Sequence, residues 1–351
     1  MARDTYTPAK DWKDKPDKTT PVLAEDLKHI ESGIQEAKDN RALKELYDDT
    51  AINVGRKANT TVGINSTAEG TQTTATAYAA HAEGVSTTAS GYYSHAEGET
   101  TTASGAAAHA EGKTTKATGS CSHAEGYYAE APGNYAHAEG YHTYANGEHS
   151  HAEGYYTKAH SPYNHAEGYQ TTAGIESAAS INGAHAEGGE SKATGSYSHA
   201  EGYSTTASGL YSHAEGSETI ASQNNTHAEG YHTSATAPYS HAEGYYTNAG
   251  MYAHAEGYYA AASAPYTHAE GYYTTAAGQY QHVQGKYNEP NGLYAHIVGG
   301  GTSDSDRKNI HTLDWEGNAV FSGNVTDGNG TSIAYLLSKI EELESKIEAL
   351  Q

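Results

Sequence analysis

The stretch YSHAEGYYTNAGMYAHAEGYYAAASAPYTHAEGYY, residues 239–273, contains the tetrapeptide His-Ala-Glu-Gly three times. The same tetrapeptide recurs along most of the chain, with a step of 14 residues except for one step of 20 and one of 13. Its copies begin at His81, His95, His109, His123, His137, His151, His165, His185, His199, His213, His227, His241, His254 and His268. A short period sustained over this length predicts a solenoid, in which each repeat forms one coil.

Each repeat can be written as 14 slots, H-A-E-G-x-x-T-x-A-x-G-x-x-S, numbered from the histidine. Alternation with period two indicates β-strands, and this length is too short for a helix, a strand and a return. We therefore predict a mainly β chain, a parallel β-solenoid with two strands per coil. Ala82, Thr87 and Ala89 should point inward, and Gly84 and Gly91 should turn the corners with positive φ.

The composition favours an oligomer without nucleic acid or membrane as a partner. The 351 residues carry a formal net charge of −23, with 31 Tyr and 39 Gly, and Leu, Ile and Val are scarce between residues 65 and 280. A monomer with so little aliphatic surface to bury would be weakly stable. The acidity disfavours nucleic acid and anionic lipid. With a lone Cys121, no Sec signal and no apolar membrane span, we expect a protein made and folded in a cytoplasm.

The repeat is similar to the 14-residue head repeats of trimeric autotransporter adhesins, through the pattern S-x-A-x-G-x-x-x-x-A-x-G. The resemblance covers roughly residues 51–300 and implies a left-handed β-roll assembled as a homotrimer. It departs at slots 1 and 3, where those repeats commonly carry Val and Ile and this chain carries His and Glu. Ile52, Val54 and Val298 occupy the same slots in outlying copies. We therefore predict that slots 1 and 3 line the trimer contact, with members that include His95, Glu97, His109, Glu111, His123 and Glu125.

Because identical carboxylates on neighbouring coils repel, we expect a partner for each glutamate. Histidine is the other polar group in every copy of the tetrapeptide. We predict hydrogen bonds between His of one chain and Glu of the next, with His held toward its charged form.

Both ends of the chain have the spacing of coiled coils. Residues 20–38 read as a helix with Thr20 at the N-cap and Pro21 at the first position. At the other end isoleucines alternate with leucines at heptad spacing: Ile333, Leu336, Ile340, Leu343, Ile347 and Leu350. Such a seam alone favours dimers, but we expect the attached roll to impose a trimer. The predicted division is an attachment segment 1–50, a shaft 51–300, a short β connector 301–330 and a coiled coil 331–351.

Two segments resemble tail and baseplate proteins of phages that infect Gram-positive bacteria. TPVLAEDLKHIESGI (20–34) resembles their N-terminal attachment helix, and LDWEGNAVFSGNVT (313–326) resembles their C-terminal module. HAEG arrays also occur in such proteins. The resemblance implies a fibre or receptor-binding appendage of the virion, assembled in the host cytoplasm and attached to the tail or baseplate through its N-terminal segment. Its partner would be a saccharide or protein of the host surface.

Two other functions remain as alternatives. The first is a bacterial cell-surface adhesin, against which the lack of a signal peptide and anchor counts. The second is a spike enzyme acting on cell-wall polysaccharide, which would need a pair of carboxylates in an irregular cleft. The glutamate column is monotonous, so we expect no enzyme and no cofactor. We also predict no regular metal site, because a metal ion needs three or four ligands that converge on one point, and a column of identical coils supplies ligands in a line. The alternative is an ion column through His137, Glu139, His151 and Glu153.

Tyrosine forms columns at the corners of the predicted coils. Stacking between neighbouring coils explains the periodicity, and an aromatic surface for saccharides is the functional alternative. The 20-residue step from His165 to His185 includes GIESAASING (174–183) and predicts a loop over Ile175–Asn182. The candidate receptor contacts are Tyr127, Tyr128, Tyr155, Tyr156, Tyr245, Tyr246, Tyr258, Tyr259, Tyr272, Tyr273, Ile175 and Glu176.

Overall fold

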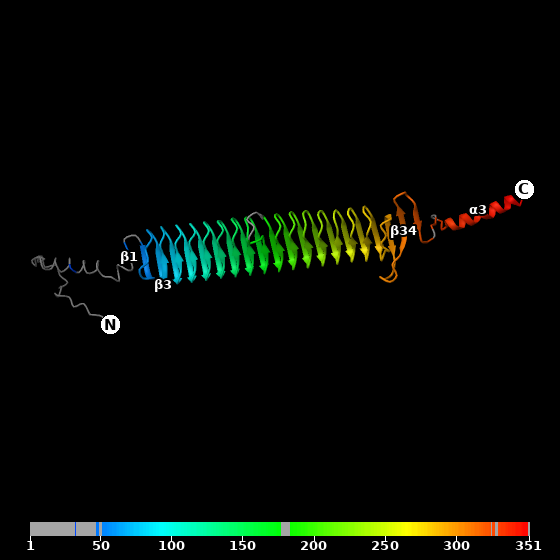
Figure 1. Cartoon of the computed structure of the whole chain (residues 1–351). Coiled ribbons are helices and arrows are strands. Elements are labelled where there is room, and N and C mark those ends of the chain that lie inside the picture. The colour runs from blue at the N-terminus through cyan, green and yellow to red at the C-terminus, as the bar shows by residue number, and fades with distance from the viewer. Residues whose placement is uncertain are drawn as a thin grey trace, which may run out of the picture.

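The computed structural model describes residues 51–176, 183–323, 325–326 and 329–349, together with 32, 47 and 48. The predicted helix 20–38 lies outside the described residues except for Ser32. So do residues 177–182 of the predicted loop. Most of the described chain is a straight stack of β coils (Figure 1). The prediction of a mainly β chain that forms a parallel β-solenoid is confirmed, and the structure has about 16 coils with a spacing near 14 residues.

Each coil contributes one long strand at slots 1–5 and one short strand at slots 8–9. The long strands are β4 (His81–Val85), β6 (His95–Glu99), β8 (His109–Lys113), β10 (His123–Tyr127), β12 (His137–Tyr141), β14 (His151–Tyr155), β16 (His165–Tyr169), β18 (His185–Gly189), β20 (His199–Tyr203), β22 (His213–Ser217), β24 (His227–Tyr231), β26 (His241–Tyr245), β28 (His254–Tyr258), β30 (His268–Tyr272) and β32 (His282–Lys286). The short strands are β5 (Thr88–Ala89), β7 (Thr102–Ala103), β9 (Lys116–Ala117), β11 (Glu130–Ala131), β13 (Tyr144–Ala145), β15 (Lys158–Ala159), β17 (Thr172–Ala173), β19 (Lys192–Ala193), β21 (Thr206–Ala207), β23 (Ile220–Ala221), β25 (Ser234–Ala235), β27 (Asn248–Ala249), β29 (Ala261–Ala262) and β31 (Thr275–Ala276).

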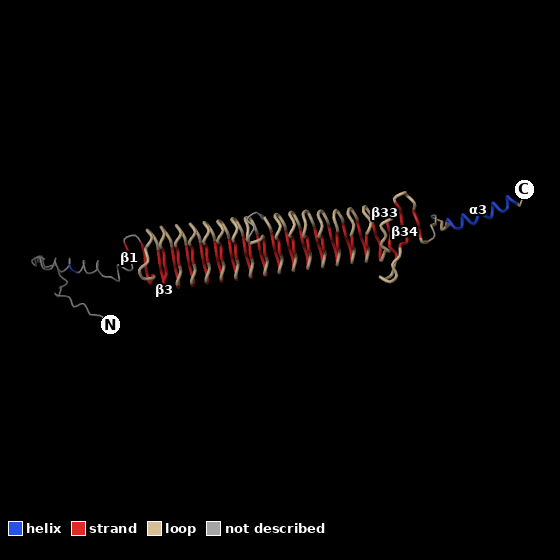
Figure 2. The backbone as a smooth tube through the Cα atoms, in the orientation of Figure 1, coloured by secondary structure: helices blue, strands red, loops and turns tan. Residues whose placement is uncertain are grey.

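The long and the short strands form two parallel ladders that run the length of the shaft (Figure 2). The register joins identical slots: His123 pairs with His137, and Glu130 pairs with Tyr144. A parallel strand pair needs a crossover, and here the rest of each coil supplies it. At the N-terminal end β1 (Tyr47–Asp48), β2 (Ala51–Arg56) and β3 (Thr67–Ala75) precede the regular coils. In-register pairing therefore turns every repeated residue type into a column along the shaft.

The interior of the coil is filled by small side chains. Ala82, Thr87 and Ala89 have no exposed surface, as the alternation predicted. The serine of slot 14 is also buried and closes its corner, because its hydroxyl donates to the carbonyl of slot 11. In the first regular coil Ser94 Oγ lies 2.7 Å from the oxygen of Gly91. The two ladders thus pack against each other through Ala, Thr and Ser alone over most of the shaft.

The glycines of slots 4 and 11 differ in conformation and surroundings, and slot 11 also holds Ala77, Ser161, Gln223, Ala237 and Ala264. Gly84 has a φ of +106°, as predicted. Gly91 does not have a positive φ, so that part of the prediction is wrong; a Cβ there would overlap the carbonyl of Gly105 in the next coil. The left-handed corners are instead slots 6 and 13, which hold non-glycine residues such as Ser86 (φ 57°) and Tyr93 (φ 60°). Non-glycine residues rarely adopt this conformation, so the stacked neighbours must hold it in place.

The buried threonines of slot 7 lead to a stability prediction. Among the described residues the hydroxyls of Thr205, Thr219 and Thr233 are buried without a hydrogen-bond partner. An unpaired buried hydroxyl is costly, and valine has nearly the same shape. We expect Thr→Val at these three sites together to raise the free energy of unfolding, measured in urea, by up to about 1 kcal/mol per site. Thr206→Val, at the half-exposed slot 8, should have no such effect. Destabilisation by the triple variant would contradict the prediction.

Beyond the shaft the strands become antiparallel. β33 (Tyr294–Gly300) continues the long-strand ladder from β32, then pairs antiparallel with β34 (Asn309–Asp314), which pairs with β35 (Ala319–Phe321). The carboxylate of Asp314 holds the β34–β35 turn by accepting hydrogen bonds from Glu316 and Asn318. The one longer described helix, α3 (Ile333–Glu348), begins at the N-cap Ser332 and lies at the C-terminal end (Figure 1). None of the described helices is long and apolar enough to cross a membrane.

Candidate functional site

The first candidate site is the outer face of the long-strand ladder. Slots 1 and 3 place His and Glu side by side there, and stacking by register makes a histidine column. The rings of His199 and His213 lie 4.9 Å apart with an interplanar angle of 1°. His241 and His254, in the 13-residue coil, lie 4.5 Å apart. The side chains are half-buried, so the column is neither core nor free surface.

In most coils the histidine of slot 1 lies near the glutamate of slot 3 in the same strand. The Nε2–Oε2 distance is 3.3 Å for His151 and Glu153, and 3.9 Å for His95 and Glu97. The same pairing holds at His109–Glu111, His123–Glu125 and His137–Glu139. Slots 1 and 3 lie on one side of a strand, so the nearest partner is two residues away. His151 and His165 come within hydrogen-bond distance of that carboxylate, whereas the Nε2 atoms of His95, His109, His123 and His137 are buried without a hydrogen-bond partner among the described residues.

At eight histidines of this column the direction of the pKa shift is opposite to the predicted one. The pKa is lowered from its usual value by burial first and by neighbouring histidines second, while the glutamates raise it in part. This holds at His95, His185, His213, His227, His241, His254, His282 and His296. Each imidazolium would have two further imidazolium neighbours less than about one Debye length away. Burial and mutual repulsion thus favour the neutral ring.

The ion-column residues His137, Glu139, His151 and Glu153 lie in a line, as the repeat implies. Three possible ligands come closer together farther along the shaft. The ligand atoms of His241, Glu243 and His254 lie within 4.8 Å of one another, as do those of His254, Glu256 and His268. Zinc binds such atoms at about 2.0–2.2 Å, so these side chains would have to converge further to share an ion. The geometry offers ligands of the correct type around the short coil.

The tyrosines form stacks, as the periodicity suggested. In slot 5 Tyr245, Tyr258 and Tyr272 are spaced 4.8 and 4.9 Å apart, nearly parallel. The slot-6 rings of Tyr246, Tyr259 and Tyr273 do the same, at 4.8 and 4.6 Å. Tyr127 stacks on Tyr141, Tyr155 on Tyr169, and His142 lies between Tyr128 and Tyr156. Stacking covers ring faces and leaves edges and hydroxyls exposed, so most of these residues cannot offer a flat face to a ligand.

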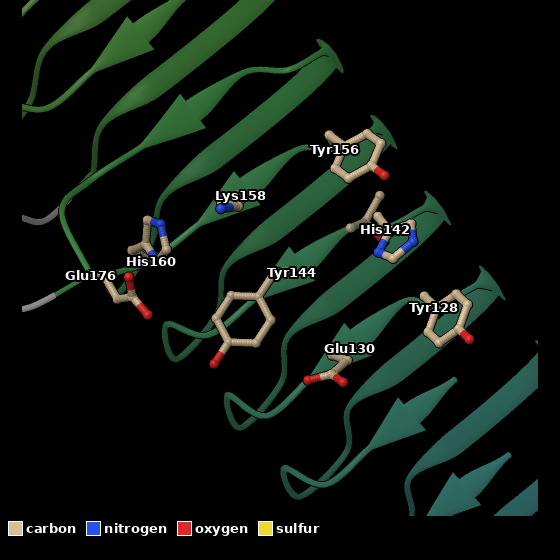
Figure 3. Close-up of a pocket in the computed structure, with 9 residues that line it drawn as sticks. Tyr128, Glu130, His142, Tyr144, Tyr156, Lys158, His160 and Glu176 are labelled. Atoms are coloured by element: carbon tan, nitrogen blue, oxygen red, sulfur yellow. The ribbon is translucent and has the colours of Figure 1, made fainter. Parts of the chain in front are cut away.

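The structure also contains a cavity of about 450 Å³ over the short-strand ladder (Figure 3). It brings together three of the predicted receptor contacts, Tyr128, Tyr156 and Glu176. Thr143 and five charged or aromatic residues complete the lining and were not predicted. The five are Glu130, His142, Tyr144, Lys158 and His160. Tyr127 and Tyr155 lie edge-on against Tyr128 and Tyr156, at 4.6 and 4.8 Å. The other six predicted tyrosines, from Tyr245 to Tyr273, lie in later coils of the shaft. Ile175 is 44% exposed beside Glu176.

The sequence contains a partial signal for the cavity. Slot 8 varies along the shaft, from Thr88 and Thr102 to Lys192 and Asn248, and its one aromatic residue between residues 67 and 276 is Tyr144. This tyrosine lies two coils before the 20-residue step, and its exceptional side chain in slot 8 distinguishes it from the regular tyrosine columns.

Searches of protein-family models and of curated proteins found no match to this chain.

Proposed function

We propose that the chain is a homotrimeric fibre of a phage tail or baseplate that reaches and binds the surface of a bacterial host. The observation that carries the proposal is a long straight shaft of parallel coils followed by a helix with an uncovered apolar side. A shaft of this kind separates two ends and presents a repeated surface between them. The N-terminal segment would attach it to the particle in the virion.

The helix α3 supports an oligomer. Its apolar residues keep 50–57% exposure: Ile333 53%, Leu336 51%, Leu337 54%, Ile340 50%, Leu343 56% and Ile347 57%. No residue of the helix is buried. Burying one such side chain is worth about 1.5–3 kcal/mol, so an apolar stripe at heptad spacing fits a helix from another copy of the chain. Leu350, the last residue of the predicted seam, lies outside the described residues.

The His–Glu face supports a contact along the shaft. It lies on the long-strand ladder, whereas the cavity and the 20-residue step lie on the short-strand side and its corner. A face that repeats without interruption can pack against copies of itself about a threefold axis. The proposed axis therefore runs along the histidine column and leaves the irregular side exposed to a receptor.

Substituting the helix stripe tests the trimer. We expect Ile340→Asp with Leu343→Asp to lower the measured mass from three chains toward one at micromolar concentration, because buried unpaired carboxylates are costly. Ser338→Asp, which introduces the same charge outside the seam, should leave the mass unchanged. Wild-type unfolding should depend on protein concentration. A wild-type mass of one chain in light scattering would contradict the trimer.

Immunogold labelling with an antibody to the shaft tests the proposed location. Gold on the tails or baseplates of phage particles supports the fibre. Gold confined to bacterial cell surfaces supports the adhesin alternative. Release of reducing ends from cell-wall polysaccharide by the purified protein would favour the spike enzyme. The antibody should not label particles from which the chain has been deleted.

A further inference from the structure

We propose that the cavity around Tyr144 is a saccharide-binding subsite, in which a sugar ring lies against the face of Tyr144. This inference rests on the proposed function in one respect, that the shaft meets a host surface. The cavity is lined by residues of three consecutive coils and by Glu176 at the start of the long step (Figure 3).

Tyr144 differs from the tyrosines of the slot-5 and slot-6 stacks in having no stacked aromatic neighbour. Its strand β13 lies between β11 and β15, so slot 8 places Glu130 on one side and Lys158 on the other. Within the described residues its ring meets one other aromatic ring, that of His160, edge-on at 6.1 Å and 60°. A sugar binds tyrosine through the flat apolar face of the ring. Tyr144 can offer that face, whereas the column tyrosines have theirs covered.

Polar groups surround the ring at the positions that sugar hydroxyls need. Glu130 and Glu176 are close enough to the phenol to raise the pKa of Tyr144, after the larger effect of burial. Lys116 Nζ lies 2.6 Å from Glu130 Oε1, so this carboxylate is already neutralised by a neighbour. Lys158 follows Tyr144 in slot 8 of the next coil, and His160 lies beside Glu176 (Figure 3). His160 Nδ1 is buried without a hydrogen-bond partner. The lining thus supplies both acceptors and donors near one aromatic ring.

The same lining favours a sugar over an apolar ligand or a peptide side chain. The lining contains no Leu, Ile, Val, Phe or Met, so it offers no aliphatic pocket. Its volume of about 450 Å³ is within the common range of about 300–1,000 Å³ for small-ligand sites. Glu130 is paired with Lys116, Glu176 lies near His160, and Lys158 adds a cation to the lining, so no strong net charge selects an ion. A neutral or N-acetylated saccharide of two or three units matches this combination.

The test uses the full chain and defined probes. Binding of maltotetraose and of chitotetraose is measured by saturation-transfer NMR and calorimetry, for the wild type, Tyr144→Thr, Glu176→Gln and Tyr252→Asn. Slot 8 holds threonine in other coils, such as Thr88, Thr102 and Thr206, so Tyr144→Thr should fold normally. Tyr252→Asn is the matched control, since it removes a tyrosine that is stacked between Tyr239 and Tyr266, and slot 13 holds asparagine at Asn225. Circular dichroism and mass confirm that each variant is assembled like the wild type.

We expect the wild type to bind at least one probe and Tyr144→Thr to lose about tenfold or more in affinity, as an aromatic residue at the centre of a site does. Tyr252→Asn should stay within about twofold of the wild type, because both faces of that ring are covered. Glu176→Gln should weaken binding less than Tyr144→Thr. Failure of the wild type to bind either probe would overturn the saccharide assignment, and equal losses in Tyr144→Thr and Tyr252→Asn would overturn the site. Binding to purified Gram-positive cell walls separates the two proposals: walls bound equally by wild type and Tyr144→Thr remove the subsite and keep the adhesive fibre.

Discussion

We expect Gly119→Ala to unfold the shaft around its own coil. Gly119 occupies slot 11, and its φ is not in the left-handed region, so alanine is acceptable to the isolated backbone. In the stack, however, a Cβ on Gly119 would overlap the carbonyl oxygen and carbon of Gly133 in the next coil. These are backbone atoms and cannot move without separating two coils and breaking the ladder. We expect a loss of more than about 4 kcal/mol, at the extreme of single substitutions.

A second glycine adds the effect of backbone conformation to the steric clash with the next coil. Gly140→Ala meets the carbonyl oxygen of Gly154 and also forces alanine into a φ of +116°, so it should be at least as damaging. Gly323→Ala is the control, because nothing lies within 4 Å of the added atom. Urea unfolding monitored by circular dichroism measures all three. Near-normal stability of Gly119→Ala would mean that the coils are spaced farther apart than the structure has them.

Acid should destabilise the shaft in the window where free histidine titrates. A histidine whose pKa is lowered by folding contributes nothing above pH ~6.5, because both states are then neutral. Below pH ~6.5 the unfolded chain takes up protons that the folded column resists, so stability falls as pH falls. Eight column histidines have lowered pKa values, from His95 to His296. The melting temperature should be flat from pH 7 to 9 and fall steeply between about pH 6.5 and 5.

Replacing part of the column tests the origin of this acid limb. His213→Gln, His227→Gln and His241→Gln together remove three neighbouring rings whose pKa values are lowered, and should flatten the fall below pH ~6.5. His149→Gln lies outside the column, in a stack with Tyr135 and Tyr163, and should leave the fall in place. Asp306, Asp314 and Glu342 have lowered pKa values of their own, but these act near pH ~4 and below. A melting temperature that instead declines on the alkaline side would support the charged histidines that the sequence first suggested.

The repeat by itself determined the β-solenoid and its interior. In a stack of in-register coils each slot meets its own copy above and below, so Ala82, Thr87 and Ala89 could be placed inside from their spacing alone. The stacking of the tyrosine columns follows from the same fact, since identical slots lie one strand spacing apart. Both inferences depend only on contacts between the same slot in adjacent coils, and the repeat period alone identifies those contacts.

Only the tertiary structure decided the relations between different slots. In most coils the column histidine lies near the glutamate of its own strand, and burial together with neighbouring imidazoles lowers the pKa of eight of these histidines. The repeat could not predict this, because its period does not specify side-chain direction or solvent exposure. Gly91 is required by the distance to the next coil and not by its φ. Tyr144 has no stacked aromatic neighbour because Glu130 and Lys158 occupy slot 8 in the adjacent coils. Glu176, from a later coil, lines the same cavity. A periodic sequence specifies contacts along its columns, whereas contacts between columns depend on the shape of the coil.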